Sequence, residues 1–252
     1  MTALARAQAF ERDGFVAVDG LLQPAEIGWY REVYDRFLAG GIDVGRRRSD
    51  LGAGADPVRA GVENITQILW PSESLPELRT SPAYERALAI ARELLGDDAA
   101  FDFDMLIDKA PGSATATPWH QDCAYWIDLP DRRAASCWIA LDDATLDNGC
   151  LWFVPGSQRE PMRPHRPAGK GGGALECDAS ESEGGAVPLG AGSCTFHAGA
   201  TLHYARGNTG AGHRRALIVN FRPRAMIELE RARGFDHGKD APGRENRNPL
   251  TR

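Results

Sequence analysis

The chain has 252 residues, 42% of them hydrophobic and 25% charged, and its formal net charge is -6. This globular composition supplies enough apolar side chains for a substantial core, and the mild acidity argues against a nucleic-acid partner, which would favour a basic surface. The sequence contains no run of about 18 apolar residues, so we expect no transmembrane helix and no membrane partner. The start of the chain lacks the apolar core of a signal peptide, so we expect a cytoplasmic protein.

The first 99 residues are predicted to be mainly helical. Apolar side chains recur at helical spacing, proline or serine-proline suits the helix starts, and glycine suits their ends. The predicted helices cover residues 3–12, 23–41 and 81–95, with a short strand or turn over 13–22. Residues 42–62 are glycine-rich and charged, so we expect a loop whose basic triplet, 46–48, is a solvated surface.

From residue 100 the apolar period changes to two, which indicates strands. Phe101, Phe103, Met105 and Ile107 fall on one face of the first strand, opposite three aspartates. Further short strands, separated by turn residues, are expected over 137–141, 150–154, 193–197, 201–205 and 215–221. Many short strands of this kind favour a mainly β fold with flanking helices and a jelly-roll, cupin-like core.

We therefore expect a single domain over 1–252, with a helical part at 1–99, a jelly-roll core at 100–225 and a polar tail at 226–252. The stretch 157–192 is rich in glycine, proline and charge and is expected to form a long loop or lid. Residues 229–252 are strongly polar and are expected to be loosely attached.

The segment PWHQDCAYW, residues 118–126, contains a His-x-Asp pair. If the segment is extended, His120 and Asp122 project to the same face. Two histidines and one carboxylate on a triangular face are typical of non-haem Fe(II) oxygenases. Such a pair also arises by chance, so the interpretation depends on a third ligand elsewhere in the chain.

Five histidines are candidates for that ligand: His165, His197, His203, His213 and His237. His165 and His237 lie in polar, loop-like stretches. His203 is favoured because the chain turns after it and returns as a strand that begins near Arg214, whose guanidinium suits a dicarboxylate. His197 is then interpreted as a packed residue or one that supports a ligand. Strand alternation leaves Arg215 open as the alternative to Arg214.

These segments together resemble the phytanoyl-CoA dioxygenase family of Fe(II)/2-oxoglutarate oxygenases, which have a double-stranded β-helix core. The resemblance covers roughly residues 8–225 and lies in FERDGFVAVDGLLQPAEI, MLIDKAPGS, WHQD, SCWIALDDATLDNGCLWFVPGS and HYARGNTGAGHRRA. It implies that Fe(II) is held by His120, Asp122 and His203 and that Arg214, eleven residues after the distal histidine, binds 2-oxoglutarate. It also places Trp138, Met105 and Gln67 near the cofactors. Ala205 stands where the family often has serine, which implies that part of 2-oxoglutarate binding differs.

The activity implied is a dioxygenase that uses O2 and 2-oxoglutarate, releases succinate and CO2, and hydroxylates a small molecule. Related halogenases lack the carboxylate ligand, so Asp122 favours hydroxylation, desaturation or cyclisation. Aromatic residues are candidates to contact the substrate: Trp119, Tyr125, Trp126 and Trp152. The alternatives are a non-catalytic cupin-like metal- or ligand-binding protein, an acyl-CoA hydroxylase of the same family, and a Zn(II) hydrolase or isomerase. The sequence indicates no oligomeric state.

Overall fold

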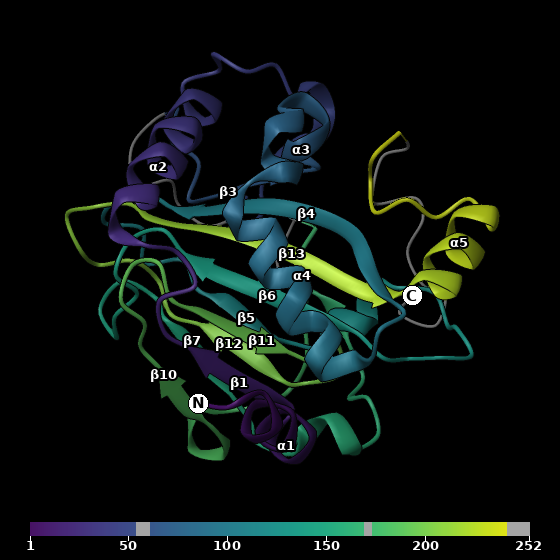
Figure 1. The fold of residues 1–252 in the computed structure, drawn as a ribbon. Coiled ribbons are helices and arrows are strands. Elements are labelled where there is room, and N and C mark those ends of the chain that lie inside the picture. The colour runs from purple at the N-terminus through teal and green to yellow at the C-terminus, as the bar shows by residue number, and fades with distance from the viewer. Residues whose placement is uncertain (54–60, 169–172, 241–252) are drawn as a thin grey trace.

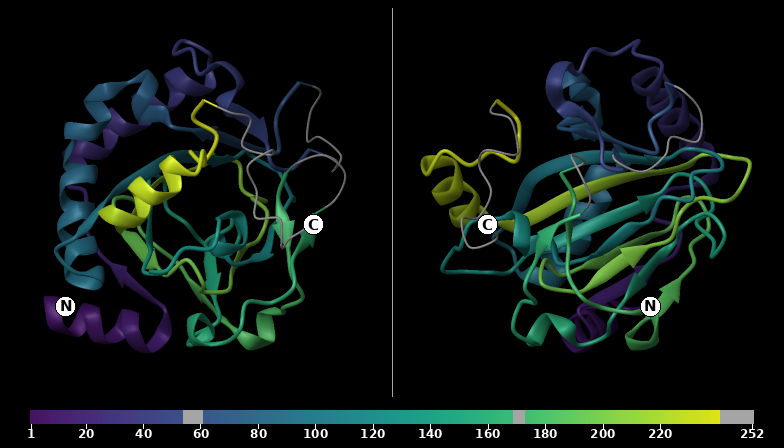
Figure 2. Two further views of the ribbon diagram at one scale, coloured as in Figure 1. Left: turned by 90° about the vertical axis from the view of Figure 1, so that its right-hand side faces the viewer. Right: turned by 180° about the vertical axis from the view of Figure 1, so that it is seen from behind.

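The computed structural model describes residues 1–53, 61–168 and 173–240. Two antiparallel sheets face one another and helices cover the outer face of the larger one (Figures 1 and 2). The larger sheet has the order β1-β11-β6-β13-β4-β3-β2 and the smaller one β10-β7-β12-β5. The strands are β1 (Phe15–Val18), β2 (Arg48–Asp50), β3 (Ile65–Leu69), β4 (Ala99–Lys109), β5 (Thr117–His120), β6 (Ala135–Ala140), β7 (Leu151–Phe153), β8 (Arg166–Pro167), β9 (Leu175–Glu176), β10 (Gly185–Val187), β11 (Cys194–His197), β12 (His203–Ala205) and β13 (Arg214–Pro223).

The helices are α1 (Ala3–Asp13), α2 (Pro24–Leu38), α3 (Pro71–Ser74), α4 (Pro82–Leu95) and α5 (Arg224–Ala232). A capping box between Gln23 and Glu26 starts α2. Alanines 83, 87 and 91 are fully buried on one stripe of α4, and their small side chains let this helix lie close against the sheet. The three predicted helices are therefore present. None of the helices in the described ranges combines the length and apolarity needed to cross a membrane.

The central strand β13 decides which face of the large sheet is the interior. It pairs with β4 from Arg214–Lys109 to Pro223–Ala99, with an irregularity around Asn220. Leu217 and Val219 pack in the cluster that contains the helices, whereas Ala216 and Ile218 pack between the sheets. Arg214 lies on the same face of β13 as Ala216 and Ile218, so its side chain faces the interior. Strand alternation alone left open which of Arg214 and Arg215 does so.

The predicted loop over 42–62 is partly regular. A 3-10 turn at Gly45–Arg47 leads into β2, which pairs with β3. The basic triplet is not a solvated surface throughout, because only Arg46 is exposed. Arg47 donates to the Ser74 hydroxyl at 2.7 Å, and Arg48 pairs with Glu63 at 3.1 Å. Residues 54–60 of this stretch lie outside the described residues.

The stretch 157–192 also differs from a long loop. It contains β8 and β9, which pair with each other, and β10, which forms the edge of the smaller sheet next to β7. Positions 169–172 are outside the described residues. The Arg163–Glu183 ion pair at 2.7 Å joins two parts of this stretch, and the Glu181–Arg206 ion pair fixes the stretch to the residue that follows β12.

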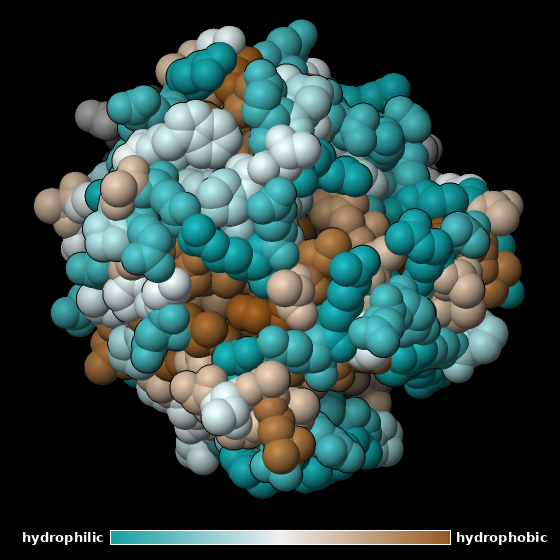
Figure 3. Space-filling model, in the orientation of Figure 1, coloured by the Kyte–Doolittle hydropathy of each residue, from teal (hydrophilic) through white to brown (hydrophobic). Residues whose placement is uncertain are grey.

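The expectation of a loosely attached C-terminal tail is wrong for residues 229–240. The helix α5 and the segment after it lie across one end of the space between the two sheets (Figure 2, left). The Glu230 side chain is buried and lies among arginines, and the indole of Trp70 donates to the Asp236 carbonyl at 2.9 Å. Ion pairs with residues of β4 and β13 bind this segment to the rest of the protein. The polarity of the segment alone does not predict these contacts. The face seen in Figure 3 is mainly hydrophilic, with apolar side chains gathered in a central hollow.

Candidate active site

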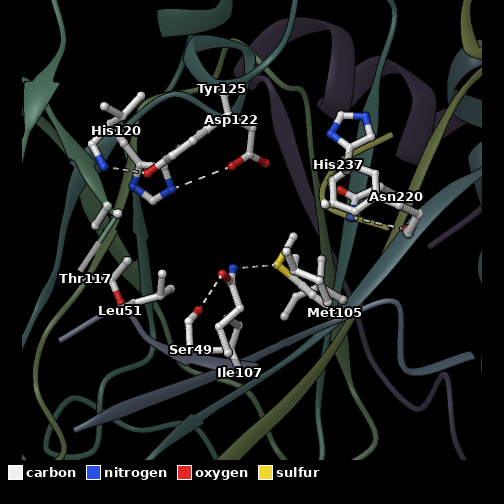
Figure 4. Close-up of a pocket in the computed structure, with 18 of the residues that line it drawn as sticks. Ser49, Leu51, Met105, Ile107, Thr117, His120, Asp122, Tyr125, Asn220 and His237 are labelled. Carbon is white, nitrogen blue, oxygen red and sulfur yellow. Dashed lines mark hydrogen bonds and ion pairs between the residues drawn. The ribbon is translucent and has the colours of Figure 1, made fainter. Parts of the chain in front are cut away.

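A cavity of about 410 Å³ lies between the two sheets. Most of the residues singled out in the sequence line this cavity: His120, Asp122, His203, Arg214, Trp138, Met105, Gln67, Tyr125 and Trp126. Figure 4 shows His120, Asp122 and Tyr125 on one side of it and Met105, Asn220 and His237 on another. Its volume is in the range of small-molecule sites, about 300–1,000 Å³.

His120, Asp122 and His203 converge at one end of this cavity. His120 ends β5, His203 begins β12, and the two are partners across the strand pair. The Asp122 Oδ1 atom is 3.6 Å from the Nε2 atom of each histidine, and the three ligand atoms lie within 4.8 Å of one another. The segment 118–126 is extended only as far as Gln121, because Asp122 opens a 3-10 helix. The carboxylate reaches the histidines through this turn.

Both histidines are oriented in the same way. The Nδ1 atom of His120 is 2.8 Å from the Pro118 carbonyl, and the Nδ1 atom of His203 is 2.9 Å from the Thr201 carbonyl. A carbonyl only accepts, so each Nδ1 carries the proton and each Nε2 keeps its lone pair. The lone pairs and the free Asp122 oxygen thus form an acceptor-only group, which suits a cation.

The second oxygen of Asp122 is held by its neighbours. Oδ2 lies 2.8 Å from the Ser136 hydroxyl and 3.2 Å from His197 Nε2. Asp122 therefore has one oxygen fixed and the other directed at the histidines, and His197 supports it, as the sequence suggested.

The remaining candidate histidines have other partners. The Nε2 atom of His165 accepts the backbone N–H of Gln121 at 3.1 Å, and its Nδ1 lies 2.7 Å from the Arg163 carbonyl. His213 pairs with Asp108 at 2.9 Å. Neither ring lines the cavity. His237 does line it, although the sequence gave this residue little weight.

Arg214 lies deep in the same cavity, with 1% of its surface exposed. Its Nε and Nη1 atoms have no hydrogen-bond partner among the described residues, and its guanidinium carbon is 5.2 Å from the centre of the Trp138 ring. Burial lowers the pKa of Arg214. A buried guanidinium with free donors is costly unless a ligand pairs with it. Arg215 points the other way and pairs with Asp142 at 2.8 Å and Asp35 at 2.6 Å, which removes it as the alternative.

Met105 and Gln67 are adjacent on the cavity wall. The Gln67 amide donates to the Met105 sulfur at 3.6 Å and accepts from the Ser49 hydroxyl at 3.5 Å (Figure 4). Ala205 also lines the cavity and offers only a methyl group there. The Lys109 ammonium, close to Arg214, donates to the carbonyls of Thr115, Ala205 and Arg206 and so fixes β12 to β4.

The aromatic candidates divide into two groups. Tyr125 and Trp126 line the cavity, and the Tyr125 hydroxyl accepts the Leu175 backbone N–H at 2.7 Å. A Cβ atom at Gly199 would lie 2.4 Å from the Trp126 ring, so glycine is required for this ring to pack there. Trp152 is outside the cavity, stacked on the Arg206 guanidinium at 4.9 Å. Trp119, which stacks on Tyr204, does not line the cavity either, so a substrate contact of these two rings stays a prediction that the cavity does not support.

Cys123, next to Asp122, is not a reactive thiolate. Burial raises its pKa to about 12. The cysteines are all free.

A second group of possible ligands, Asp102, Glu230 and His237, lies at the other end of the cavity. Arg222 pairs with Asp102 at 2.6 Å and also with Glu230, and Arg231 pairs with both carboxylates. Because two guanidinium groups already neutralise the two carboxylates, this group is an ion-pair cluster and not a cation site. Asp102 comes from β4, the paired Arg222 from β13, and Glu230, Arg231 and His237 from the C-terminal segment. No local sequence motif therefore indicates this cluster.

Comparison with known proteins decides the family. A family model described as Phytanoyl-CoA dioxygenase (PhyH) matches residues 10–216. The chain belongs to this family. The ectoine dioxygenase of Streptomyces coelicolor is 31% identical over 156 residues, covering 60% of this chain and 50% of that protein. The peroxisomal phytanoyl-CoA dioxygenase of Bos taurus is 25% identical over 234 residues, covering 87% and 68%. The chain thus spans about half the length of the ectoine dioxygenase and two thirds of the bovine enzyme.

Solved structures agree with this assignment. EvdO2 from Micromonospora carbonacea var. aurantiaca, complexed with 2-oxoglutarate, is 29% identical with a TM-score of 0.68, and the match covers 86% of this chain and 89% of EvdO2. The epimerase SnoN, in complex with Fe3+, alpha ketoglutarate and nogalamycin RO, is 26% identical with a TM-score of 0.68, and the match covers 87% and 82%. The predicted double-stranded β-helix fold and the predicted PhyH family are confirmed.

The residues of this PhyH-family chain fit both cofactors. The oriented pair of histidines with the fixed carboxylate fits a divalent iron ion, because all three ligand atoms are free acceptors. The unpaired Nε and Nη1 donors of Arg214 fit a carboxylate that takes two parallel hydrogen bonds. The cavity brings both features together.

Proposed function

We propose that this protein hydroxylates a small-molecule substrate with O2 and 2-oxoglutarate and releases succinate and CO2. One observation carries the proposal. The His120, Asp122 and His203 group and the unpaired guanidinium of Arg214 open into a single cavity. The remainder of that cavity is lined mainly by apolar and aromatic side chains, and this part is left for the substrate.

Each residue has a defined task in this proposal. His120, Asp122 and His203 bind iron on one face, and the Nδ1 hydrogen bonds to Pro118 and Thr201 keep both rings aimed at it. Iron with 2-oxoglutarate supplies the activation of O2. Arg214 binds the carboxylate of 2-oxoglutarate that does not reach the metal.

Two further features bear on the reaction itself. Trp138 and Met105 line the cavity with largely apolar surface and exclude water from the cofactors. Asp122 is a ligand with a carboxylate, so the position that a halide takes in related halogenases is filled. Hydroxylation is therefore preferred to halogenation.

The basic side chains argue for a substrate other than a CoA ester. A CoA ester would require free cations for its phosphates. Arg47 and Arg48 are engaged by Ser74 and Glu63, and Arg163 and Arg166 by Glu183 and Glu176. Lys170 lies outside the described residues. Among Arg46, Arg47, Arg48, Arg163 and Arg166, only Arg46 is exposed without an ion pair in the described part of the chain.

An anaerobic titration with Fe(II) and 2-oxoglutarate tests the cofactor assignment. We expect a weak visible charge-transfer band that requires both additions and is absent in Asp122→Ala. Intact protein that gives no band would refute the proposal. When air is admitted, we expect succinate to form and O2 to be consumed together.

Oxygen-isotope labelling tests the type of reaction. With 18O2, a hydroxylase places the label in its product, whereas an epimerase, as SnoN is named, inverts a centre without incorporating it. Activity that survives strict removal of O2 would instead indicate a hydrolase, and metal binding without succinate release would indicate a binding protein.

A further inference from the structure

The wall of the cavity away from the metal is built by the C-terminal segment. Glu230, Phe235, His237 and Gly238 all line the cavity. The two views in Figure 2 place this segment at one end of the sheets, and Figure 4 shows His237 across the cavity from Asp122. The family model matches residues 10–216, and this segment follows them. The part of the cavity wall that it builds therefore lies outside the matched region.

The backbone holds His237 in an unusual conformation. Its φ is 54°, in the left-handed region that non-glycine residues rarely adopt. The Asp236 carboxylate produces this turn by accepting the backbone N–H groups of Gly238 at 2.9 Å, Lys239 at 3.2 Å and Asp240 at 2.9 Å. Backbone conformations of this kind are concentrated at ligand sites.

The imidazole itself is fixed on three sides. Its Nε2 atom is 2.9 Å from Glu230 and 3.5 Å from Asp102. Its face stacks on Phe103, with ring centres 4.0 Å apart, and Trp126 meets it edge-on at 6.4 Å. The ring therefore has one orientation, in which Nε2 faces the ion-pair cluster.

The charges around His237 come from three elements. Asp102 of β4 and Glu230 of α5 are negative, and Arg222 of β13 and Arg231 of α5 are positive, so these four cancel. Burial alone would lower the pKa of His237, but Asp102 and Glu230 raise it above its ordinary value. A protonated His237 thus carries the one unbalanced positive charge of the cluster.

The Nδ1 atom of His237 has no hydrogen-bond partner in the described ranges, and the ring lines the cavity. We propose that His237 binds the substrate, donating from Nδ1 to a carboxylate at the end of the substrate remote from the reacting carbon. Phe103, Ile218 and Trp126 line the intervening space, so the substrate class is a small carboxylic acid with an apolar body. This inference rests on the proposed function, because it takes the metal end of the cavity as the place of reaction.

Calorimetry on the protein loaded with Mn(II) and 2-oxoglutarate tests the inference, because Arg214 is then occupied. The probes are arylalkanoic acids of increasing chain length and the primary amide of each acid, which has the same shape and no charge. A hydrogen bond to a charged group is worth about 1.5–3 kcal/mol, so we expect at least one acid to bind about ten- to a hundredfold more tightly than its amide.

Two variants assign that preference to His237. His237→Asn keeps a residue that tolerates the left-handed backbone, and we expect it to bind the acid and its amide equally while amide affinity stays the same. Lys239→Gln is the matched control. It removes a positive charge from the same turn, at a side chain that pairs with Glu73 and does not line the cavity, and it should keep the preference.

Three outcomes would overturn the inference: no acid binds, acids and amides bind equally to the unaltered protein, or Arg46→Gln abolishes the preference while His237→Asn keeps it. A failure of the proposed function is recognised separately, because it removes the Fe(II) and 2-oxoglutarate band from the unaltered protein. If that band forms and the acid preference is absent, only the role of His237 is refuted.

Discussion

Two neighbouring arginines at the start of β13 have opposite surroundings. Arg214 faces the cavity with free donors, and Arg215 faces the helices and is saturated by Asp142 and Asp35. The alternation of a strand separates them by one residue. The pair is therefore a matched test, since each substitution removes the same charge from the same strand.

We predict that Arg214→Met weakens 2-oxoglutarate binding by about a hundredfold or more, because two hydrogen bonds to a charged group are lost. It should not lower the free energy of unfolding, since it also removes an unpaired buried charge. Arg215→Met should do the reverse, lowering stability and leaving 2-oxoglutarate affinity intact. Calorimetric titration and urea unfolding measure the two quantities. Equal 2-oxoglutarate affinity in both variants would contradict the assignment.

Ser136 contacts the oxygen of Asp122 that faces away from His120 and His203. Its hydroxyl lies 2.8 Å from Asp122 Oδ2 and 2.7 Å from the Asn220 amide oxygen. We predict that Ser136→Ala weakens metal binding by about 10–100-fold, the usual effect of losing such a partner. Mn(II) titration followed by electron paramagnetic resonance measures it. Ser136→Thr, which keeps the hydroxyl, should restore most of the affinity, and a loss equal to that of Ser136→Ala would indicate a packing role instead.

The residues that sequence reasoning found share one property. His120 and Asp122 belong to a short motif, and His203 and Arg214 are linked by the family's spacing of eleven residues, across the connection from β12 to β13. His237 has neither signal, because it belongs to no motif and its partner Asp102 comes from the distant strand β4. A contact between such distant residues is not visible to local pattern analysis.

At the scale of elements, periodicity predicted the helices α1, α2 and α4 and the long strand β4. It did not predict how the polar segments dock. α5 was expected within a loose tail, yet buried ion pairs hold it to β4 and β13. Polarity indicates exposure only when the charges lack partners within the protein, and partners on distant strands are not readable from the segment itself.

We predict that the docking of α5 depends on pH. The pKa of Glu230 is lowered, so its contribution is present above its ordinary value of 4.5 and is lost as the pH falls. The pKa of His237 is raised, so its contribution is complete below its ordinary value of 6.5 and is lost as the pH rises through the raised pKa. Docking should therefore be firmest between these values. The other charged groups facing His237 are Asp102, Arg222 and Arg231.

Amide hydrogen exchange of residues 224–240, corrected for intrinsic rates, measures this docking. Protection should decrease on the alkaline side in the unaltered protein, while His237→Asn should show lower protection and no alkaline decrease. Protection in α2 serves as the internal control, because Tyr34 and Phe37 of this helix pack in the apolar cluster under the helices and do not contact His237. Protection of α5 that stays constant from mildly acidic to alkaline pH would contradict the prediction.

At the scale of the whole molecule, the two sheets place ligands from β5 and β12 opposite a guanidinium from β13. Cofactors that bind there join the two sheets and bind only the folded chain. A ligand of this kind stabilises the protein by about 2.7 kcal/mol at a concentration one hundred times its dissociation constant. The free energy of unfolding thus reports on the site without any knowledge of the substrate.

We predict that Mn(II) raises the unfolding midpoint and that 2-oxoglutarate raises it further only when the metal is present. Asp122→Ala should lose both increments, because the metal anchors the co-substrate, and Arg214→Met should lose only the second. His213→Asn is the control, since His213 pairs with Asp108 outside the cavity and should leave both increments intact. Thermal unfolding with and without a chelator measures all four proteins. An equal metal-induced shift in Asp122→Ala would mean that the stabilising ion binds elsewhere, and the triad would then not be the metal site.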